Sequence, residues 1–266
     1  MIDLNFKNRV VLVTASSRGI GFAVARAFYE AGARVAICSR NQEELQKAIG
    51  KIENVNRDRI FGIRCDLSKI DECTQLIKEV ENYFKKGVDI LVNNSGGPPP
   101  MSVVDTSVED WYSAIHQNLL SSVVISKLVY PGMVKQRFGR IIFLTSTLAK
   151  EPSGNMVLSN VTRAGVAAFS KTLSKEIPAT SNITVNTILT GGCKTERFFS
   201  LLERQASQTG ESVDKVLERL LKSVPVGYFS TPGEFAKTVL FLSSKDSSYL
   251  NGLALPIDGG TLKSVF

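Results

Sequence analysis

Residues 10–30 of the chain read VVLVTASSRGIGFAVARAFYE, and the expected fold follows from them. It begins with an apolar run without alternating polar positions, which is typical of a strand covered on both faces. The turn that follows contains Gly19 and Gly21 and leads into a helical pattern over 22–30. Glycines let the backbone approach a pyrophosphate, and a helix N-terminus offers it free N–H groups and partial positive charge. The stretch therefore predicts a strand–turn–helix unit that binds a dinucleotide.

The same alternation of apolar runs and helical patterns continues to the C-terminus. Strands are expected at Val10–Thr14, Val35–Cys38, Ile60–Cys65, Ile90–Val92, Ile141–Leu144, Val185–Leu189 and Leu253–Ile257. Helices are expected at Ile20–Glu30, Glu43–Ile52, Glu72–Tyr83, Val108–Val134, Val157–Glu176 and Glu234–Leu242. This alternation predicts a parallel sheet with helices on both faces. We expect one Rossmann-type, doubly wound α/β domain with seven strands over residues 1–266.

One segment departs from this rhythm. Residues 195–223 are helical in pattern and are inserted between the sixth and seventh expected strands, where substrate lids tend to occur. The segment begins near Arg197-Phe198-Phe199, and the proline-rich loop Gly96–Met101 follows the fourth expected strand. Together they predict an apolar mouth with a basic rim. A rigid surface loop and an ordinary amphipathic helix are the alternative.

The charge and the scarce residue types narrow the function. The chain has 32 Lys and Arg against 25 Asp and Glu, a formal net charge of +7. The basic residues are spread singly, so a nucleic-acid partner is not favoured, and an anionic cofactor or substrate suits the charge better. The single histidine, His116, argues against a His-rich metal site and a Ser-His-Asp triad.

Cysteine use and hydropathy concern the compartment. The four cysteines are Cys38, Cys65, Cys73 and Cys193. They show no Cys-x-x-Cys spacing, so neither a metal cluster nor a disulfide framework is predicted. This use of cysteine fits a reducing compartment. There is no signal-peptide pattern at the N-terminus and no run of about 20 apolar residues. We therefore expect a cytoplasmic protein without a membrane partner.

The end of the second strand distinguishes two nicotinamide cofactors. An Asp or Glu there, about 20 residues after the glycines, would favour the free ribose 2′-hydroxyl of NAD(H). This chain has Ser39-Arg40-Asn41 instead, and Arg18 lies in the glycine turn. Because guanidinium groups suit phosphate geometry, NADP(H) is predicted over NAD(H).

Ordered motifs along essentially the whole chain resemble the short-chain dehydrogenase/reductase family, with the 3-oxoacyl-acyl-carrier-protein reductases as the nearest branch. The family's Thr-Gly-x-x-x-Gly-x-Gly turn matches 14–21, with Ala15 in place of the first glycine. Its Asn-x-x-x-Pro-Gly-x-x-x-Thr stretch matches 186–195, with Thr190 in place of proline. Further matches are Asp66, Asn93-Asn94-Ser95-Gly96, Asn118, Ser146 and Asp258-Gly259-Gly260.

The resemblance implies a cofactor site and an assembly. The residues it assigns to the cofactor, with those inferred above, are Thr14, Ser16, Ser17, Arg18, Gly19, Ile20, Gly21, Ser39, Arg40, Asp66, Leu67, Asn94, Ser95, Gly96, Arg163, Gly191 and Thr195. It further implies reduction of a small-molecule carbonyl such as a 3-oxoacyl thioester, a sugar or a keto acid. A homodimer or homotetramer is expected through 108–134, 157–176 and the C-terminal strand.

The catalytic pair of the family is absent. Its Tyr-x-x-x-Lys is represented here by Ser159 and Arg163, which share one helix face at this spacing. In the family the tyrosine exchanges a proton with the substrate oxygen, and the lysine lowers the tyrosine pKa. A serine hydroxyl is a much weaker acid, and arginine stays charged at ordinary pH. Tyr112, Tyr130 and Tyr228 show no sign in the sequence of replacing the lost phenol.

Three interpretations therefore remain open. The first is a reductase with an altered relay, in which Asn118 and Ser146 polarise the carbonyl and a water held by Ser159 carries the proton. Arg163 would then orient ribose or bind an anionic substrate. The second is a non-catalytic NADP(H)-binding protein that acts as a sensor or partner subunit. The third is a protein that binds another anion, nucleic acid included.

Overall fold

A computed structural model describes residues 2–52 and 57–265 of the chain. One parallel sheet of seven strands organises it, in the order β3-β2-β1-β4-β5-β6-β7. The strands are β1 (Val10–Val13), β2 (Arg34–Ser39), β3 (Ile60–Arg64), β4 (Ile90–Asn93), β5 (Gly139–Leu144), β6 (Ile183–Thr190) and β7 (Ala254–Ile257). This confirms the predicted doubly wound α/β architecture.

The first strand shows why these apolar runs form a central sheet. Val11 and Val13 belong to the core on one face, and Val10 and Leu12 belong to the core on the other. All four side chains are fully buried. A strand buried on both faces needs no polar alternation, and it is covered by helices on each side.

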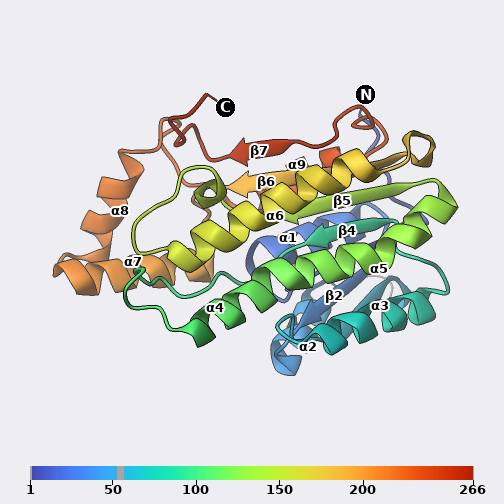
Figure 1. The fold of residues 1–266 in the computed structure, drawn as a ribbon, viewed down its shortest axis with the longest axis horizontal. Helices are drawn as coiled ribbons and strands as arrows, with labels where there is room; N and C mark the ends of the chain where they lie inside the picture. Colours follow the sequence, from blue (N-terminus) through green and yellow to red (C-terminus); the bar gives the residue numbers. More distant parts are fainter. Residues whose placement is uncertain (1, 53–56, 266) are drawn as a thin grey trace.

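Helices cover both faces of the sheet (Figure 1). One core packs α1 (Gly19–Glu30), α2 (Gln42–Ile52) and α9 (Pro232–Ser243) against the sheet. The opposite core packs α3 (Ile70–Phe84), α5 (Ser121–Gln136) and α6 (Val157–Glu176). No described helix is long and apolar enough to cross a membrane.

The helix expected over 108–134 is interrupted. It begins as α4 (Val108–Ala114), where Ser107 and Asp110 form a reciprocal capping box, and resumes as α5. Between them, Ile115–Leu120 adopts a π-helical turn that contains the buried Asn118. Such turns are rare and often occur at functional sites. The hydrophobic periodicity on either side gave no sign of this interruption.

The inserted segment folds as two helices, α7 (Glu196–Thr209) and α8 (Val213–Leu221), which lie together at one end of the molecule (Figure 1). Thr195 caps α7 by accepting a hydrogen bond from the Phe198 N–H at 3.2 Å. Leu202, Ala206 and Val216 form a small separate core between the two helices. The segment therefore has its own packing and stands at the carboxyl end of β6.

Candidate active site

The glycine turn is built so that its backbone is accessible. Helix α1 begins at Gly19, and Arg18 before it makes no side-chain capping hydrogen bond. A Cβ atom on Gly21 would lie 2.6 Å from Asn94 Nδ2 and 2.8 Å from the Ala15 carbonyl oxygen. Only glycine fits there, because Cβ atoms do not approach neighbours this closely. The helix N-terminus thus offers uncapped N–H groups to an anion, which fits the pyrophosphate of a dinucleotide.

Polar contacts tie the turn to the neighbouring strand β4. The Asn94 N–H donates to Thr14 Oγ1 at 2.8 Å, and Thr14 Oγ1 donates to the Asn94 carbonyl at 2.6 Å. Asn94 Nδ2 donates to the Ala15 carbonyl at 2.9 Å. Ser16 is buried and donates to the Val13 carbonyl. These hydrogen bonds fix the conformation of the turn and its position beside the end of β4.

Ala15 occupies a left-handed backbone conformation, with φ of 45°. This conformation brings the Cβ of an alanine close to the following carbonyl oxygen and costs about 1–2 kcal/mol, whereas glycine adopts it freely. The family motif has glycine at this position. The chain therefore carries a small strain directly before its dinucleotide turn.

We expect Ala15→Gly to stabilise the protein by about 1 kcal/mol, after allowing for the greater freedom of glycine in the unfolded chain. Chemical denaturation of the two proteins measures this. Gly50→Ala is the control: Gly50 lies on α2 with open space around it, and there alanine should be the more stabilising residue because glycine disfavours a helix. No gain in stability for Ala15→Gly would show that the turn relaxes around the alanine.

The end of β2 gathers the expected 2′-phosphate residues and one carboxylate. Arg40 is exposed there, and Ser17 Oγ donates to Ser39 Oγ at 3.1 Å. Glu44 of α2 accepts a 3.3 Å hydrogen bond from Ser17 and lies 3.5 Å from Arg18. Arg18 also lies 3.2 Å from Glu196 of α7. Glu44 is absent from the residues predicted by the sequence, because it reaches this corner from α2 and not from the end of β2.

Asp66 and Leu67 follow β3 on the same edge. Burial opposes ionisation of Asp66, but hydrogen bonds from Ser68 and the charges of Lys69 and Arg40 lower its pKa. Its carboxylate oxygen accepts from the Ser68 N–H at 3.0 Å and from the Ser68 hydroxyl at 2.8 Å. Asp66 therefore stays ionised, and its carboxylate is held in place beside the end of β2. An adenine amine could donate a hydrogen bond to it there.

Three of the cysteines meet behind this edge although they are far apart in sequence. A hydrogen bond with Cys38 raises the pKa of Cys65, and a hydrogen bond with Cys65 raises that of Cys73, with burial adding to both shifts. All four cysteines of the chain are free and buried. The described residues hold no group of three His, Cys, Asp or Glu placed to bind a metal.

Asn118 faces the loop after β4. Its Nδ2 donates to Ser95 Oγ at 2.7 Å and to the Gly96 carbonyl at 2.8 Å. Its Oδ1 is buried and accepts no hydrogen bond from any described residue. A buried acceptor without a partner is costly, so a water or ligand donor is the natural complement of this atom.

Ser146 follows β5, and α6, which carries Ser159 and Arg163, packs against the turn Thr147–Ala149 just after it. Ser146 Oγ accepts from the Leu148 N–H at 3.2 Å, and its own O–H donates to no described residue. Ser159 is 5% exposed, and its hydroxyl makes no hydrogen bond within the described residues. Arg163 Nη1 donates to the Leu144 carbonyl at 3.0 Å. Burial, with the charge of Arg197, lowers the pKa of Arg163 to about 10, so its guanidinium is protonated at neutral pH.

Gly191 and Thr195 bring the inserted helices to the glycine turn. A Cβ on Gly191 would lie 2.6 Å from Asp258 Cα, so glycine allows β6 to pass closely beside the C-terminal segment. Thr195 Cγ2 lies 3.6 Å from the position of a Cβ on Gly19. Two arginines of α7 reach the loop 96–101: Arg197 donates to the Pro98 carbonyl at 2.7 Å and Arg204 to the Pro100 carbonyl at 3.3 Å. The sequence placed Arg197 at the start of the inserted segment, and the structure shows which loop its guanidinium contacts.

The three tyrosines considered as replacements for the family's catalytic phenol form no hydrogen bond with Ser146 or Ser159 among the described residues. Tyr228 is half exposed and donates to Glu234, a hydrogen bond that raises the pKa of Tyr228. Tyr112 is 63% exposed on α4, and Tyr130 packs against the core beneath α5. Within the described part of the chain, no hydrogen bond or ion pair joins these three phenols to Ser146 or Ser159.

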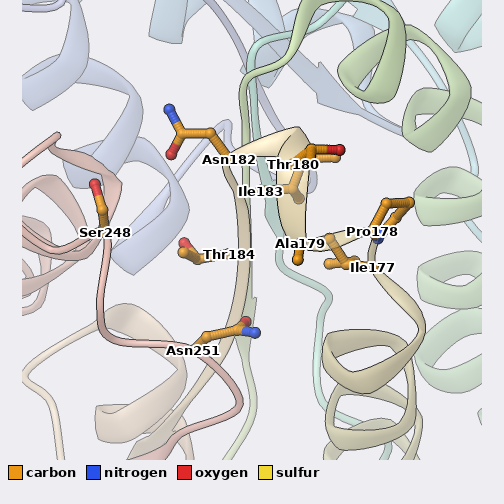
Figure 2. Close-up of a pocket in the computed structure, with 9 residues that line it drawn as sticks. All are labelled: Ile177, Pro178, Ala179, Thr180, Asn182, Ile183, Thr184, Ser248 and Asn251. Carbon is orange, nitrogen blue, oxygen red and sulfur yellow. The ribbon is translucent and has the colours of Figure 1, made fainter.

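A separate hollow of about 370 Å³ lies at the opposite end of the sheet (Figure 2). The turn before β6, the start of β6 and the segment before β7 line it, and Thr184, Ser248 and Asn251 are among its polar residues. Thr184 Oγ1 is buried without a partner among the described residues. Because the strands are parallel, their carboxyl ends and the candidate active site are on the far edge.

The fold and the glycine turn define a Rossmann-type domain. Residues 9–206 match the family model described as short chain dehydrogenase. A relative is the 3-oxoacyl-[acyl-carrier-protein] reductase FabG of Chlamydia trachomatis, 34% identical over 255 residues, which are 95% of this chain and 97% of that protein. The chain therefore belongs to the short chain dehydrogenase family.

Two solved structures are close in shape. L-sorbose reductase from Gluconobacter frateurii, complexed with NADPH and L-sorbose, superposes with a TM-score of 0.93 at 28% identity, covering 99% of this chain and all of that one. A variant of the actinorhodin polyketide ketoreductase with NADPH has a TM-score of 0.90, also at 28% identity, with 99% and 100% coverage. These similarities support an oxidoreductase.

Proposed function

We propose that the chain is an NADP(H)-dependent reductase of a small-molecule carbonyl, with a proton relay that lacks tyrosine. The observation that carries the proposal is the Ser146 hydroxyl, which is anchored by the Leu148 N–H and has its own O–H free to donate. Asn118 Oδ1, on the π-helical turn that packs against α6, is buried without a partner among the described residues, and the Ser159 hydroxyl on α6 makes no hydrogen bond with them. A site that had lost its chemistry has no need for such unpaired polar groups.

The residues present fit the cofactor. The uncapped start of α1 would take the pyrophosphate, Asp66 the adenine, and Arg18 and Arg40 the 2′-phosphate. Thr14, Ile20, Ser95, Gly191 and Thr195 surround the same edge. The two NADPH complexes among the structural neighbours support this assignment. When bound, NADP(H) supplies the hydride that the carbonyl carbon accepts.

Side chains of the protein would polarise and protonate the carbonyl oxygen of the substrate. Ser146 donates a hydrogen bond to the carbonyl and polarises it. As the carbon is reduced, the oxygen must take a proton. A water between Ser159 and Asn118 Oδ1 can deliver it and regain a proton from bulk water. Arg163 stays protonated at neutral pH and can hold an anionic group of the substrate. The product is an alcohol.

The helices α7 and α8 serve as the substrate lid in this proposal, since Arg197 and Arg204 fasten α7 to the loop 96–101. We further propose a homo-oligomer. Tyr112, Leu128 and Val161 are exposed apolar residues on α4, α5 and α6, the helices that the family resemblance implies as the contact.

Consumption of NADPH with a panel of ketones, 2-oxo acids, sugars and 3-oxoacyl thioesters tests the function. Turnover of any one of them, identified as the alcohol product, supports it. Tight binding of NADPH without turnover of the whole panel would favour the non-catalytic sensor instead.

Cofactor preference gives a second test. We expect Arg40→Ala and Arg18→Ala each to weaken NADPH roughly tenfold while leaving NADH nearly unchanged, because only NADPH carries the 2′-phosphate that these guanidinium groups bind. Fluorescence titration of both cofactors measures this. Arg26→Ala is the matched control, since Arg26 is exposed on α1 and pairs with Glu30. Equal losses for NADH and NADPH would contradict the assignment.

A further inference from the structure

Two arginines near the candidate active site have no carboxylate partner among the described residues. Arg163 is partly buried on α6 and Arg197 stands on α7, and neither forms an ion pair with any described residue. Each guanidinium has one described acceptor, a neutral backbone carbonyl at Leu144 or Pro98. Arg18 nearby is different, because Glu44 and Glu196 offset its charge.

The sheet brings the elements that carry the two arginines to the same edge. Asn93 of β4 pairs with Phe143 of β5, so the loop that continues β4 starts beside Leu144. The guanidinium of Arg197 lies against Gly97 in that loop, where a Cβ would come within 2.9 Å of Nη2. The end of the loop then contacts the start of α6, since the Val157 N–H donates to the Met101 carbonyl at 3.4 Å. Helices α6 and α7, which carry Arg163 and Arg197, therefore both contact the loop that follows β4.

Their charges act on each other. Burial, then the charge of Arg197, lowers the pKa of Arg163. Although Arg197 as a whole is exposed, burial of its guanidinium and the charge of Arg18 lower its pKa as well. Like charges held close together without a counter-ion are unfavourable, and an anion between them removes that cost.

We infer that Arg163 and Arg197 together bind the carboxylate of a short oxo acid, so that the substrate is a 2-oxo or 3-oxo acid. Leu144, which holds Arg163, is two residues before Ser146. The anionic group must therefore lie close to the carbonyl that Ser146 polarises. A carboxylate one or two bonds from the carbonyl meets this requirement, and a neutral sugar offers no charge for either guanidinium. The inference rests on the proposed function of this site.

The test compares each oxo acid with its neutral amide. Binding to the protein in complex with NADP⁺ is measured by calorimetry for a series of 2-oxo and 3-oxo acids of increasing length and for the matching amides. No turnover is needed, because the oxidised cofactor cannot reduce a ketone. We expect at least one acid to bind roughly tenfold to a hundredfold more tightly than its amide, the range for hydrogen bonds to a charged group.

Variants then separate anion binding from lid positioning. Arg197→Gln should reduce the preference for acid over amide about tenfold, whereas a merely structural arginine would weaken acid and amide alike. Arg163→Lys should reduce it too, because an ammonium keeps the charge but loses the planar fork. Arg204→Gln is the matched control: it also removes an arginine of α7 that bonds a carbonyl of the same loop, and it should leave the preference unchanged.

Distinct results overturn the inference and the proposed function. Equal binding of acids and amides throughout, or an equal loss of preference in Arg204→Gln, overturns the carboxylate site. Loss of NADPH affinity in Arg197→Gln as large as the loss of oxo-acid affinity overturns it as well, because the anion would then be the cofactor pyrophosphate. An oxo acid that binds with the expected preference and is not reduced with NADPH leaves the carboxylate site standing and removes the reductase.

Discussion

Replacing Ser159 by tyrosine and Arg163 by lysine should raise the reduction of simple neutral ketones by about a hundredfold or more, the usual contribution of a positioned general acid. The two residues lie one turn apart on α6, with Arg163 at the Leu144 carbonyl. The double variant introduces a phenol, and the neighbouring ammonium can lower the pKa of that phenol toward operating pH. The single variants Ser159→Tyr and Arg163→Lys are the controls, because each supplies only half of the pair.

The pH profile provides an independent readout of this variant. In the natural chain, the charge of Arg163, whose pKa is about 10, sets the expected pH dependence of the rate. Its cation is present below that pH and is lost as the pH rises through it, so the rate should stay level from about pH 6 to 9. As the pH rises, the double variant should begin to lose rate earlier than the natural chain, because its tyrosine deprotonates first. A double variant that folds, binds NADPH and stays as slow as the natural chain would show that the missing pair is not what limits ketone reduction.

The second large effect is expected from Ser146→Ala. Removing a donor aimed at a developing oxyanion lowers the rate roughly a hundredfold to a thousandfold. NADPH affinity should stay within about twofold, since Ser146 is not among the residues assigned to the cofactor. Steady-state rates and fluorescence titration measure the two quantities on the same protein.

Ser107→Ala is the matched control for Ser146→Ala. Both serines accept a backbone N–H at the start of a helical segment, and Ser107 does so in the capping box of α4. Loss of a cap costs stability in both variants, but only Ser146→Ala should lose turnover. Unchanged turnover in Ser146→Ala would remove the polarising role from this residue.

Local patterns were sufficient to predict most of the fold. Strands buried on both faces, as at Val10–Val13, have a continuous apolar signal, and helix patterns between them give the parallel order. The π-helical turn at Ile115–Leu120 escaped prediction because nothing in the hydrophobic spacing marks it. Its consequence is functional, since it carries Asn118 with a buried oxygen that has no partner among the described residues.

The glycine turn, the arginines Arg18 and Arg40, and the expectation that Ser159 and Arg163 replace the Tyr-x-x-x-Lys pair all came from residues close together in the chain. Which charges meet depends on the tertiary structure. Arg18 contacts Glu196 across 178 residues, and Arg197 rests against Gly97. Such contacts depend on how separate elements converge at the carboxyl edge of one sheet, and no local periodicity encodes that convergence. In our proposals the basic excess acts at the 2′-phosphate through Arg18 and Arg40, and at a substrate carboxylate through Arg163 and Arg197, which have no ion-pair partner among the described residues.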